Sequence, residues 1–426
     1  MNTSRNLLKQ SFFNGVGYVY LVVVSLISYP LFIRFSGAAL FGFYLTLTGI
    51  IGLFVTLDYG LSKSLIYSLS CHKPGSVIWN NRVQAGLSLS LLLGLINALV
   101  AFVFFRYYLF GLGSFSVFTQ ESFWIAVLPA AIILVYLQNQ TLLSLFQSQQ
   151  QFAAYNLVLM AMGTSNTLIS AFIFGSSHSL TSVFVFQLSF QTLTLCTLLV
   201  IYRLLHRHLY MPQVIPKVWF SLLKYGLKQF VGVVASQLDF HTSRILIATF
   251  LNSTLVTVFS LPQTLVLKAS GGVSQLSLSL LPFSVKNQKT GTKKVYRTVL
   301  FSLGASFFLG LSAVTVIWLF ADALLTLWLG DNALASAVAP VLRLLSLFLF
   351  LNVLTPVPTV IFESWGLPHI PSLSAIATVS LNLVFLWIFI PRFGVLGATY
   401  SLLMSSLITV PIYLLVFFYH LNKRRG

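Results

Sequence analysis

The chain has 426 residues, of which 57% are hydrophobic and only 7% are charged, and its formal net charge at pH 7 is +18. Its mean hydropathy is +0.92. This composition excludes a soluble basic protein, because no polar stretch is long enough to form a soluble domain. We therefore expect the chain to lie almost entirely within a membrane.

Twelve apolar runs follow one another along the chain, each near the roughly 20 residues that an α-helix needs to cross a bilayer. They lie at about 12–33, 41–69, 84–106, 122–146, 153–175, 180–202, 225–250, 255–281, 298–320, 338–362, 371–391 and 395–419. The runs are continuous and do not alternate at every second residue, which indicates helices and not strands. The predicted fold class is all-α, a polytopic membrane protein of about twelve transmembrane helices. The first run is too long for the core of a signal peptide, so we expect it to be retained.

Lysine and arginine are distributed unevenly between the two sides of this predicted bundle. An even number of spans places both termini on one side, where 16 of the 24 Lys and Arg residues fall. Only Arg34, Arg106 and Arg392 fall on the opposite side. Because cytoplasmic loops carry the excess of Lys and Arg, both termini are predicted to be cytoplasmic.

A basic segment at about 203–224, with Pro212 and Pro216, separates the first six spans from the last six. It predicts a cytoplasmic linker between an N-terminal lobe, 1–210, and a C-terminal lobe, 211–426, arranged around a central cavity. We interpret its positive charge as a topology signal and not as a nucleic-acid surface. No nucleic-acid partner is expected, and no metal or other cofactor.

Five cations remain inside or at the edges of the predicted spans: Lys63, Lys228, Arg244, Lys268 and Arg343. Each such charge costs on the order of 2.5–3.5 kcal/mol at the centre of a membrane helix. Lys63 and Lys228 lie near predicted cytoplasmic edges, so an interfacial position and a cavity position stay open for them. We expect the three deeper cations to face an aqueous cavity that binds an anionic cargo, because cationic side chains pair well with phosphate oxygens.

Two embedded acids, Asp58 and Asp239, accompany these cations. A carboxylate in this position either forms an ion pair with an embedded cation or titrates during transport, and both roles stay open.

Polar side chains also recur at helical spacing along two spans. Gln140, Ser144 and Gln147 share one face of the fourth span, and Gln187 and Gln191 share one face of the sixth. They predict either a hydrated stripe suited to sugar hydroxyls or hydrogen bonds between neighbouring helices.

Several short motifs, in their order and spacing, resemble those of the Wzx-type polysaccharide flippases of the multidrug/oligosaccharidyl-lipid/polysaccharide (MOP) exporter superfamily. They are PLFIRFSG at 30–37, LFGFY at 40–44, DYGL at 58–61, KYG at 224–226, RILI at 244–247, VFS at 258–260, LP at 281–282, LNL at 381–383 and IPRFGVLGA at 390–398. One departure is Ser243, which stands where relatives often place an acid before the arginine at position 244. An Asp–Arg role is therefore not carried over to this span.

The resemblance implies a two-lobed bundle in a bacterial inner membrane. It implies alternating access that moves undecaprenyl-pyrophosphate-linked O-antigen or polysaccharide repeat units to the periplasmic leaflet, with coupling to an ion. A polysaccharide polymerase and a chain-length regulator are the implied protein partners. The alternatives are a cation-coupled drug exporter of the same superfamily and a membrane-embedded polysaccharide polymerase or ligase. We expect no enzyme, because the segments 107–121 and 321–337 on the opposite side offer no nucleophile and base pair.

Overall fold

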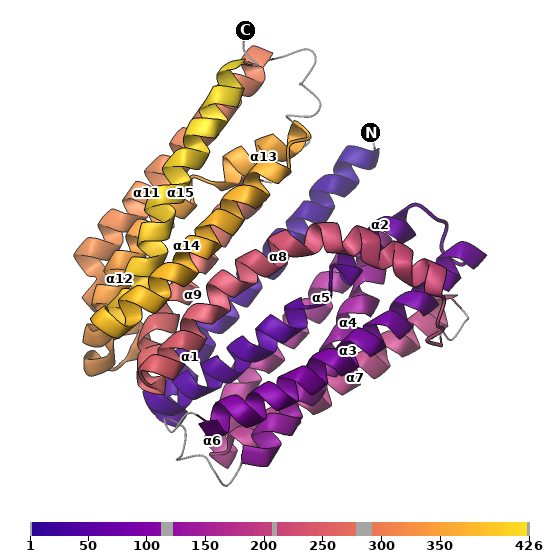
Figure 1. Ribbon diagram of the computed structural model, residues 1–426, viewed down its shortest axis with the longest axis horizontal. Helices are drawn as coiled ribbons and strands as arrows, with labels where there is room; N and C mark the ends of the chain where they lie inside the picture. The colour runs from indigo at the N-terminus through magenta and orange to yellow at the C-terminus, as the bar shows by residue number, and fades with distance from the viewer. Residues whose placement is uncertain (1, 112–121, 207–210, 278–291, 424–426) are drawn as a thin grey trace. The chain divides into compact units, whose positions relative to one another are not determined.

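The computed structural model describes residues 2–111, 122–206, 211–277 and 292–423 (Figure 1). Throughout these ranges the regular structure is helical, which confirms the all-α prediction. The α-helices are α1 (Asn2–Thr56), α2 (Leu61–Ser70), α3 (Val77–Gly111), α4 (Ser122–Ser148), α5 (Phe152–Thr164), α6 (Ser170–Ser177), α7 (Leu180–His206), α8 (Pro216–Phe250), α9 (Ser253–Ser277), α11 (Thr292–Leu329), α12 (Asn332–Asn352), α13 (Pro356–Ser364), α14 (His369–Phe393) and α15 (Val395–Lys423), and a π-helix, η2 (Ser165–Ile169), joins α5 to α6. The predicted motif Leu281-Pro282 and parts of the basic segments lie outside the described residues.

Within the described ranges, nine helical stretches are long and apolar enough to cross a membrane. The first, Gly15–Thr56, is 42 residues long and contains the first predicted span and the start of the second. The two meet at Gly37, whose φ of 75° and ψ of 163° lie in a region that only glycine adopts readily. The seventh and eighth predicted spans correspond to α8 and α9, which are not among the nine. The chain is a multi-pass membrane protein.

Two predicted spans are interrupted in the structure. The span predicted at 41–69 is divided between α1 and α2, because Tyr59 and Gly60 adopt left-handed conformations with φ of 54° and 73°. The span predicted at 338–362 is divided between α12 and α13, and Pro356 occupies the start of α13. Proline suits that position because its missing N–H has no partner in the first helical turn.

The chain forms two compact units, each considered by itself. The first contains Met1–Gly37 and Thr46–Gln237, and the second contains Ala38–Leu45 and Leu238–Gly426. The chain passes from one unit to the other twice inside α1, after Gly37 and after Leu45, and once inside α8, after Gln237. The predicted boundary between functional lobes at residue 210 stays a prediction.

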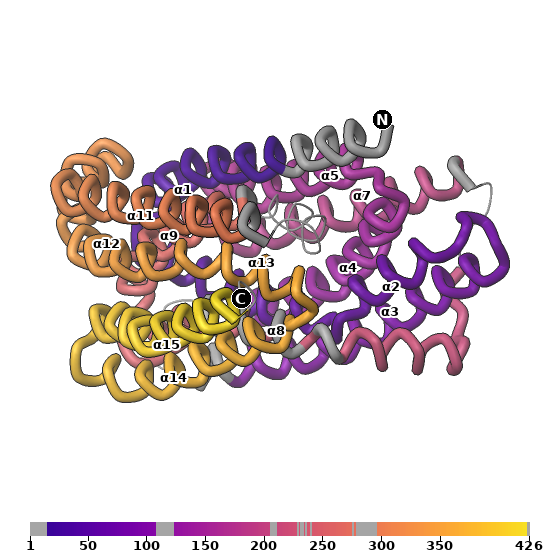
Figure 2. Tube along the Cα trace, turned by 90° about the horizontal axis from the view of Figure 1, so that it is seen from above, coloured from indigo at the N-terminus to yellow at the C-terminus, as the bar shows by residue number. Residues whose placement is uncertain are grey.

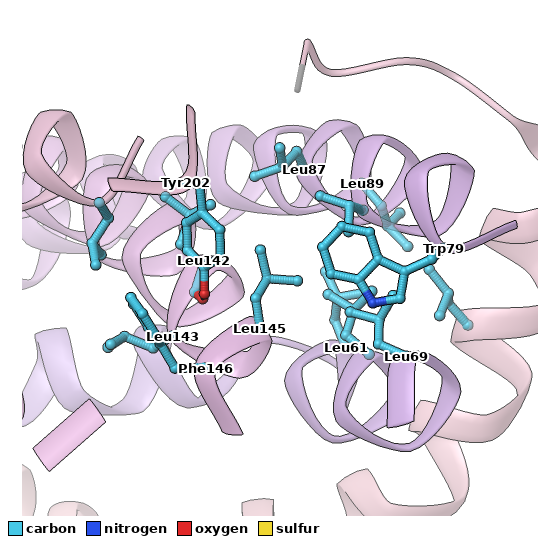
Figure 3. Packing of buried hydrophobic residues seen from close by; sticks show 14 of the residues in the cluster. Leu61, Leu69, Trp79, Leu87, Leu89, Leu142, Leu143, Leu145, Phe146 and Tyr202 are labelled. Atoms are coloured by element: carbon cyan, nitrogen blue, oxygen red, sulfur yellow. The ribbon is translucent and has the colours of Figure 1, made fainter. Parts of the chain in front are cut away.

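A layer of large apolar side chains holds α2, α3, α4 and α7 together in the first unit (Figure 3). Trp79 and Phe146 are among its buried members, and the hydroxyl of Tyr202 donates to the carbonyl oxygen of Leu142 at 3.2 Å. Because lipid is as apolar as leucine, close packing and such hydrogen bonds hold membrane helices together. This layer fixes α2 against the rest of the unit.

An aromatic cluster has the same role in the second unit. Phe362 on α13 is fully buried and packs against Tyr413 and Phe417 on α15. The hydroxyl of Thr359, also on α13, lies 2.9 Å from the hydroxyl of Tyr413. Figure 2 shows α14 and α15 running side by side, in agreement with their extensive contact.

Candidate functional site

Arg244 is a buried cation on α8, with only 4% of its surface exposed. Its Nε donates to Oε1 of Gln263 at 3.2 Å, and its Nη2 donates to Oγ1 of Thr264 at 3.0 Å. Both partners lie on α9 and are neutral. These two hydrogen bonds orient the guanidinium. We call Arg244, Gln263 and Thr264, together with the buried His241 one turn earlier on α8, the Arg244 cluster.

Lys268, the second predicted cavity cation, lies four residues after Thr264 on α9 and therefore on the same helical face. Its side chain is half-buried. The structure thus brings two of the predicted cations, Arg244 and Lys268, to neighbouring turns of one helix pair in the second unit. The side chains of Asp239 and Lys228, both on α8, lie outside the part of the chain that the structure describes.

Arg343, the third predicted cavity cation, has a carboxylate partner. On α12 it forms an ion pair with Asp322 on α11, and the two side chains are 31% and 61% exposed. The sequence interpretation missed this pair because it placed Asp322 in a segment between spans. In the structure α11 continues as a helix to Leu329.

Asp58, one of the two predicted coupling acids, lies just before α2, and its carboxylate accepts hydrogen bonds from the backbone at the start of that helix. Its Oδ1 accepts a hydrogen bond from the backbone N–H of Gly60 at 2.8 Å, and its Oδ2 accepts one from Ser62 at 3.1 Å. The N–H groups of the first helical turn have no backbone partner of their own, so the carboxylate satisfies two of them. Lys63, on the next turn, is exposed.

The two polar stripes make hydrogen bonds within the first unit. Nε2 of Gln187 donates to Oγ of Ser170 at 2.9 Å and to the carbonyl oxygen of Asn166 in the π-helix at 3.4 Å. Oε1 of Gln191 accepts from Nδ2 of Asn139 at 2.9 Å. For these two glutamines the structure supports the alternative of contacts between helices. The sequence interpretation missed Asn139, although an asparagine inside an apolar run is visible in the sequence. In the structure this asparagine is fully buried.

The fourth-span stripe is engaged more locally. Ser144 is buried and donates to the carbonyl oxygen of Thr141 at 2.6 Å. Gln140 hydrogen-bonds Tyr136 in the preceding turn, and Gln147 hydrogen-bonds Tyr155 on α5. A role for this stripe toward a cargo stays a prediction.

Metal-binding groups do not gather in the described ranges: no three His, Cys, Asp or Glu side chains there are placed to hold an ion. Among the predicted site residues, the charged side chains that the structure describes are Arg244 and Lys268 on α8 and α9, Arg343 with its partner Asp322, and Asp58 and Lys63 around the start of α2.

Comparison with known proteins gives the family. Residues 7–288 match the family described as "Polysaccharide biosynthesis protein", and residues 288–388 match the MatE family. The chain is 20% identical over 399 residues to a protein of Shigella flexneri named "Putative O-antigen transporter", with 93% of this chain and 94% of that protein covered.

Solved structures share the fold at low sequence identity. A structure described as "Lipid II flippase MurJ, inward closed conformation" matches with a TM-score of 0.78 and 14% identity, covering 95% of this chain and 87% of that one. An inward-facing multidrug resistance MATE family transporter of the MOP superfamily matches with a TM-score of 0.75 and 16% identity, covering 98% and 95%. The names of these proteins describe transporters and a flippase, in agreement with the expectation that this chain is not an enzyme. The chain belongs to the polysaccharide biosynthesis protein family and has the fold of the MOP superfamily transporters.

Proposed function

We propose that the protein is a flippase for an oligosaccharide linked to undecaprenyl diphosphate. In this proposal it moves the headgroup from the cytoplasmic to the periplasmic leaflet of a bacterial inner membrane while the lipid tail stays in the bilayer. The observation that carries the proposal is Arg244, a buried cation inside a membrane bundle, whose guanidinium is oriented by hydrogen bonds to Gln263 and Thr264. A guanidinium held in this way binds a diphosphate well, because its N–H groups match phosphate oxygens.

Lys268 supplies the second positive charge in this proposal. It lies one helical turn from Thr264, a direct partner of Arg244, so the two cations lie near the same part of α9. A cationic or apolar drug gains nothing from this pair, which disfavours the drug-exporter alternative. The similarity to a protein named for O-antigen transport supports a sugar-bearing cargo.

The remaining steps follow the alternating-access scheme. Lobes 1–210 and 211–426 rock about a central cavity, and Asp58 or Asp239 couples the cycle to an ion. Both termini lie in the cytoplasm. A polysaccharide polymerase and a chain-length regulator receive the product on the periplasmic side.

The test is to delete the gene and to locate the lipid-linked oligosaccharide. A flippase defect leaves it on the cytoplasmic leaflet, protected from a periplasmic glycan-modifying enzyme. A polymerase or ligase defect instead leaves single repeat units exposed on the periplasmic side, and that result would reject the proposal. Complementation with the wild-type chain, but not with Arg244→Ala, links the phenotype to the Arg244 cluster.

A further inference from the structure

Two tyrosines stack face to face between α2 and α8 in the first unit. The rings of Tyr67 and Tyr225 are nearly parallel, with an interplanar angle of 8° and centroids 4.6 Å apart. Tyr225 is partly buried, whereas 56% of the surface of Tyr67 is exposed. One face of Tyr67 is therefore covered by its partner, and much of the remaining surface is open.

The backbone next to this stack is held in a fixed register. A Cβ atom added to Gly60 would lie 2.2 Å from the carbonyl oxygen of Gly226, and one added to Gly226 would lie 2.6 Å from the carbonyl oxygen of Tyr59. Two glycines thus allow an approach that any side chain would prevent. Tyr59 also stacks on Phe230, with ring centroids 5.1 Å apart. These contacts keep α2 from sliding along α8, so the open ring of Tyr67 has a defined position.

Two lysines lie close in the sequence to the stacked tyrosines. Lys63 precedes Tyr67 by four residues on α2, so the two share one helical face. Lys224 precedes Tyr225 on α8, and both lysines are exposed. The sequence of α2 contains no acidic residue. The surface formed by Lys63, Tyr67, Lys224 and Tyr225, which we call the Tyr67 surface, combines an aromatic face with two ammonium groups.

These two kinds of group match the two parts of a glycosylated diphosphate. The C–H face of a sugar ring packs on the electron-rich face of an aromatic ring, and ammonium groups attract phosphate oxygens. We propose that the Tyr67 surface is a first binding site for the headgroup, with the sugar on Tyr67 and the diphosphate on Lys63. The inference rests on the proposed function and adds a site separate from the Arg244 cluster.

The position of the surface fits a loading step. α2 ends at Ser70, and the segment after it contains Lys73, one of the residues that predict the cytoplasmic side. A headgroup that waits in the cytoplasmic leaflet meets this level of the protein before it meets any deeper residue. Tyrosine and lysine also anchor membrane proteins at the interface without binding a ligand, so the experiment has to separate the two roles.

The experiment measures binding of two probes to the purified full-length protein in lipid nanodiscs. One probe is undecaprenyl diphosphate, and the other is the same lipid carrying a single N-acetylglucosamine. Tyr67→Ala is expected to weaken binding of the glycosylated probe about threefold to tenfold, the size of one aromatic stacking contact, and to leave the bare diphosphate unchanged. Tyr67→Phe keeps the ring and should bind both probes like wild type. Lys63→Gln should weaken both probes.

Tyr107 provides the matched control. It is 75% exposed, lies on α3 and is not part of the Tyr67 surface, so Tyr107→Ala should leave both affinities unchanged. The inference is overturned if Tyr67→Ala changes neither affinity or lowers both equally while the wild type binds. If the wild type binds neither probe, the proposed function itself fails and this site fails with it. Elution as a single species on size-exclusion chromatography checks that each variant is folded.

Discussion

Arg343 on α12 and Asp322 on α11 form an ion pair that joins two consecutive helices of the second unit. Both side chains are partly exposed, and Asp322 lies seven residues before the end of α11. The pair neutralises both charges locally. This geometry favours a structural role for Arg343 over the anion-binding role that its position in the sequence suggested.

The first prediction separates these two roles. Arg343→Gln should lower the free energy of unfolding by no more than about 1 kcal/mol, as for other exposed ion pairs, and should leave the transport rate within about twofold of wild type. Thermal unfolding in detergent and headgroup translocation in proteoliposomes measure the two quantities. A fully inactive Arg343→Gln that unfolds at the wild-type temperature would return Arg343 to the substrate site.

Arg244 should respond in the opposite way, because its surroundings differ. It is buried and held by Gln263 and Thr264. We predict that Arg244→Ala abolishes transport while the protein stays folded, because it removes the guanidinium that the proposed function assigns to the diphosphate. Arg244→Lys should retain only part of the rate, because an ammonium group cannot reproduce the two directed hydrogen bonds of the guanidinium. Arg343→Gln is the matched control, and equal rates for Arg244→Ala and this control would exclude Arg244 from the site.

The sequence predicted the helical fold well because membrane helices must be long, continuous and apolar to satisfy their backbone in lipid. It predicted the interactions of individual side chains less well. Asp58 looked like an embedded charge, and in the structure its carboxylate accepts two backbone hydrogen bonds at the start of α2. Arg343 pairs with Asp322 on another helix, and Gln191 likewise pairs with Asn139 on another helix. Such pairings depend on how helices pack, which periodicity along one helix does not determine.

Asp58 gives a prediction in which stability and transport are read separately. Asp58→Ala removes both side-chain acceptors at the start of α2 and should lower the free energy of unfolding by about 0.5–2 kcal/mol. Asp58→Asn keeps one oxygen acceptor on Cγ, so it can retain one of the two hydrogen bonds and should be more stable than Asp58→Ala. Thermal unfolding of the three proteins checks this order, and an Asp58→Asn protein as unstable as Asp58→Ala would contradict the capping role.

The same Asp58→Asn variant reports on ion coupling. It lacks the negative charge of the carboxylate and has one oxygen acceptor, so it can retain one of the two hydrogen bonds from Gly60 and Ser62. If its transport rate falls while the protein stays folded, the coupling step in the proposed mechanism belongs to Asp58. If the rate is unchanged across the working pH range, Asp239 becomes the coupling acid.

The last prediction concerns Gly42 on α1, which the backbone of α9 approaches closely in the second unit. A Cβ atom on Gly42 would lie 1.7 Å from the carbonyl oxygen of Ser253, far inside van der Waals contact. The hydroxyl of Thr257, one turn further along α9, donates to the carbonyl oxygen of Ala38 at 2.6 Å and holds the two segments together. Gly42→Ala should therefore force the backbones apart and destabilise the protein by about 1–3 kcal/mol.

A second glycine makes this outcome easy to interpret. Gly304, inside α11, has no atom within 4 Å of an added Cβ, so Gly304→Ala should stabilise the helix by about 0.5–1 kcal/mol through its higher helix propensity. The two substitutions add the same methyl group to helical glycines and are predicted to shift the unfolding temperature in opposite directions. Stabilisation by both would mean that helix propensity outweighs the contact at Ser253, and the close approach of α1 and α9 would then not need a glycine.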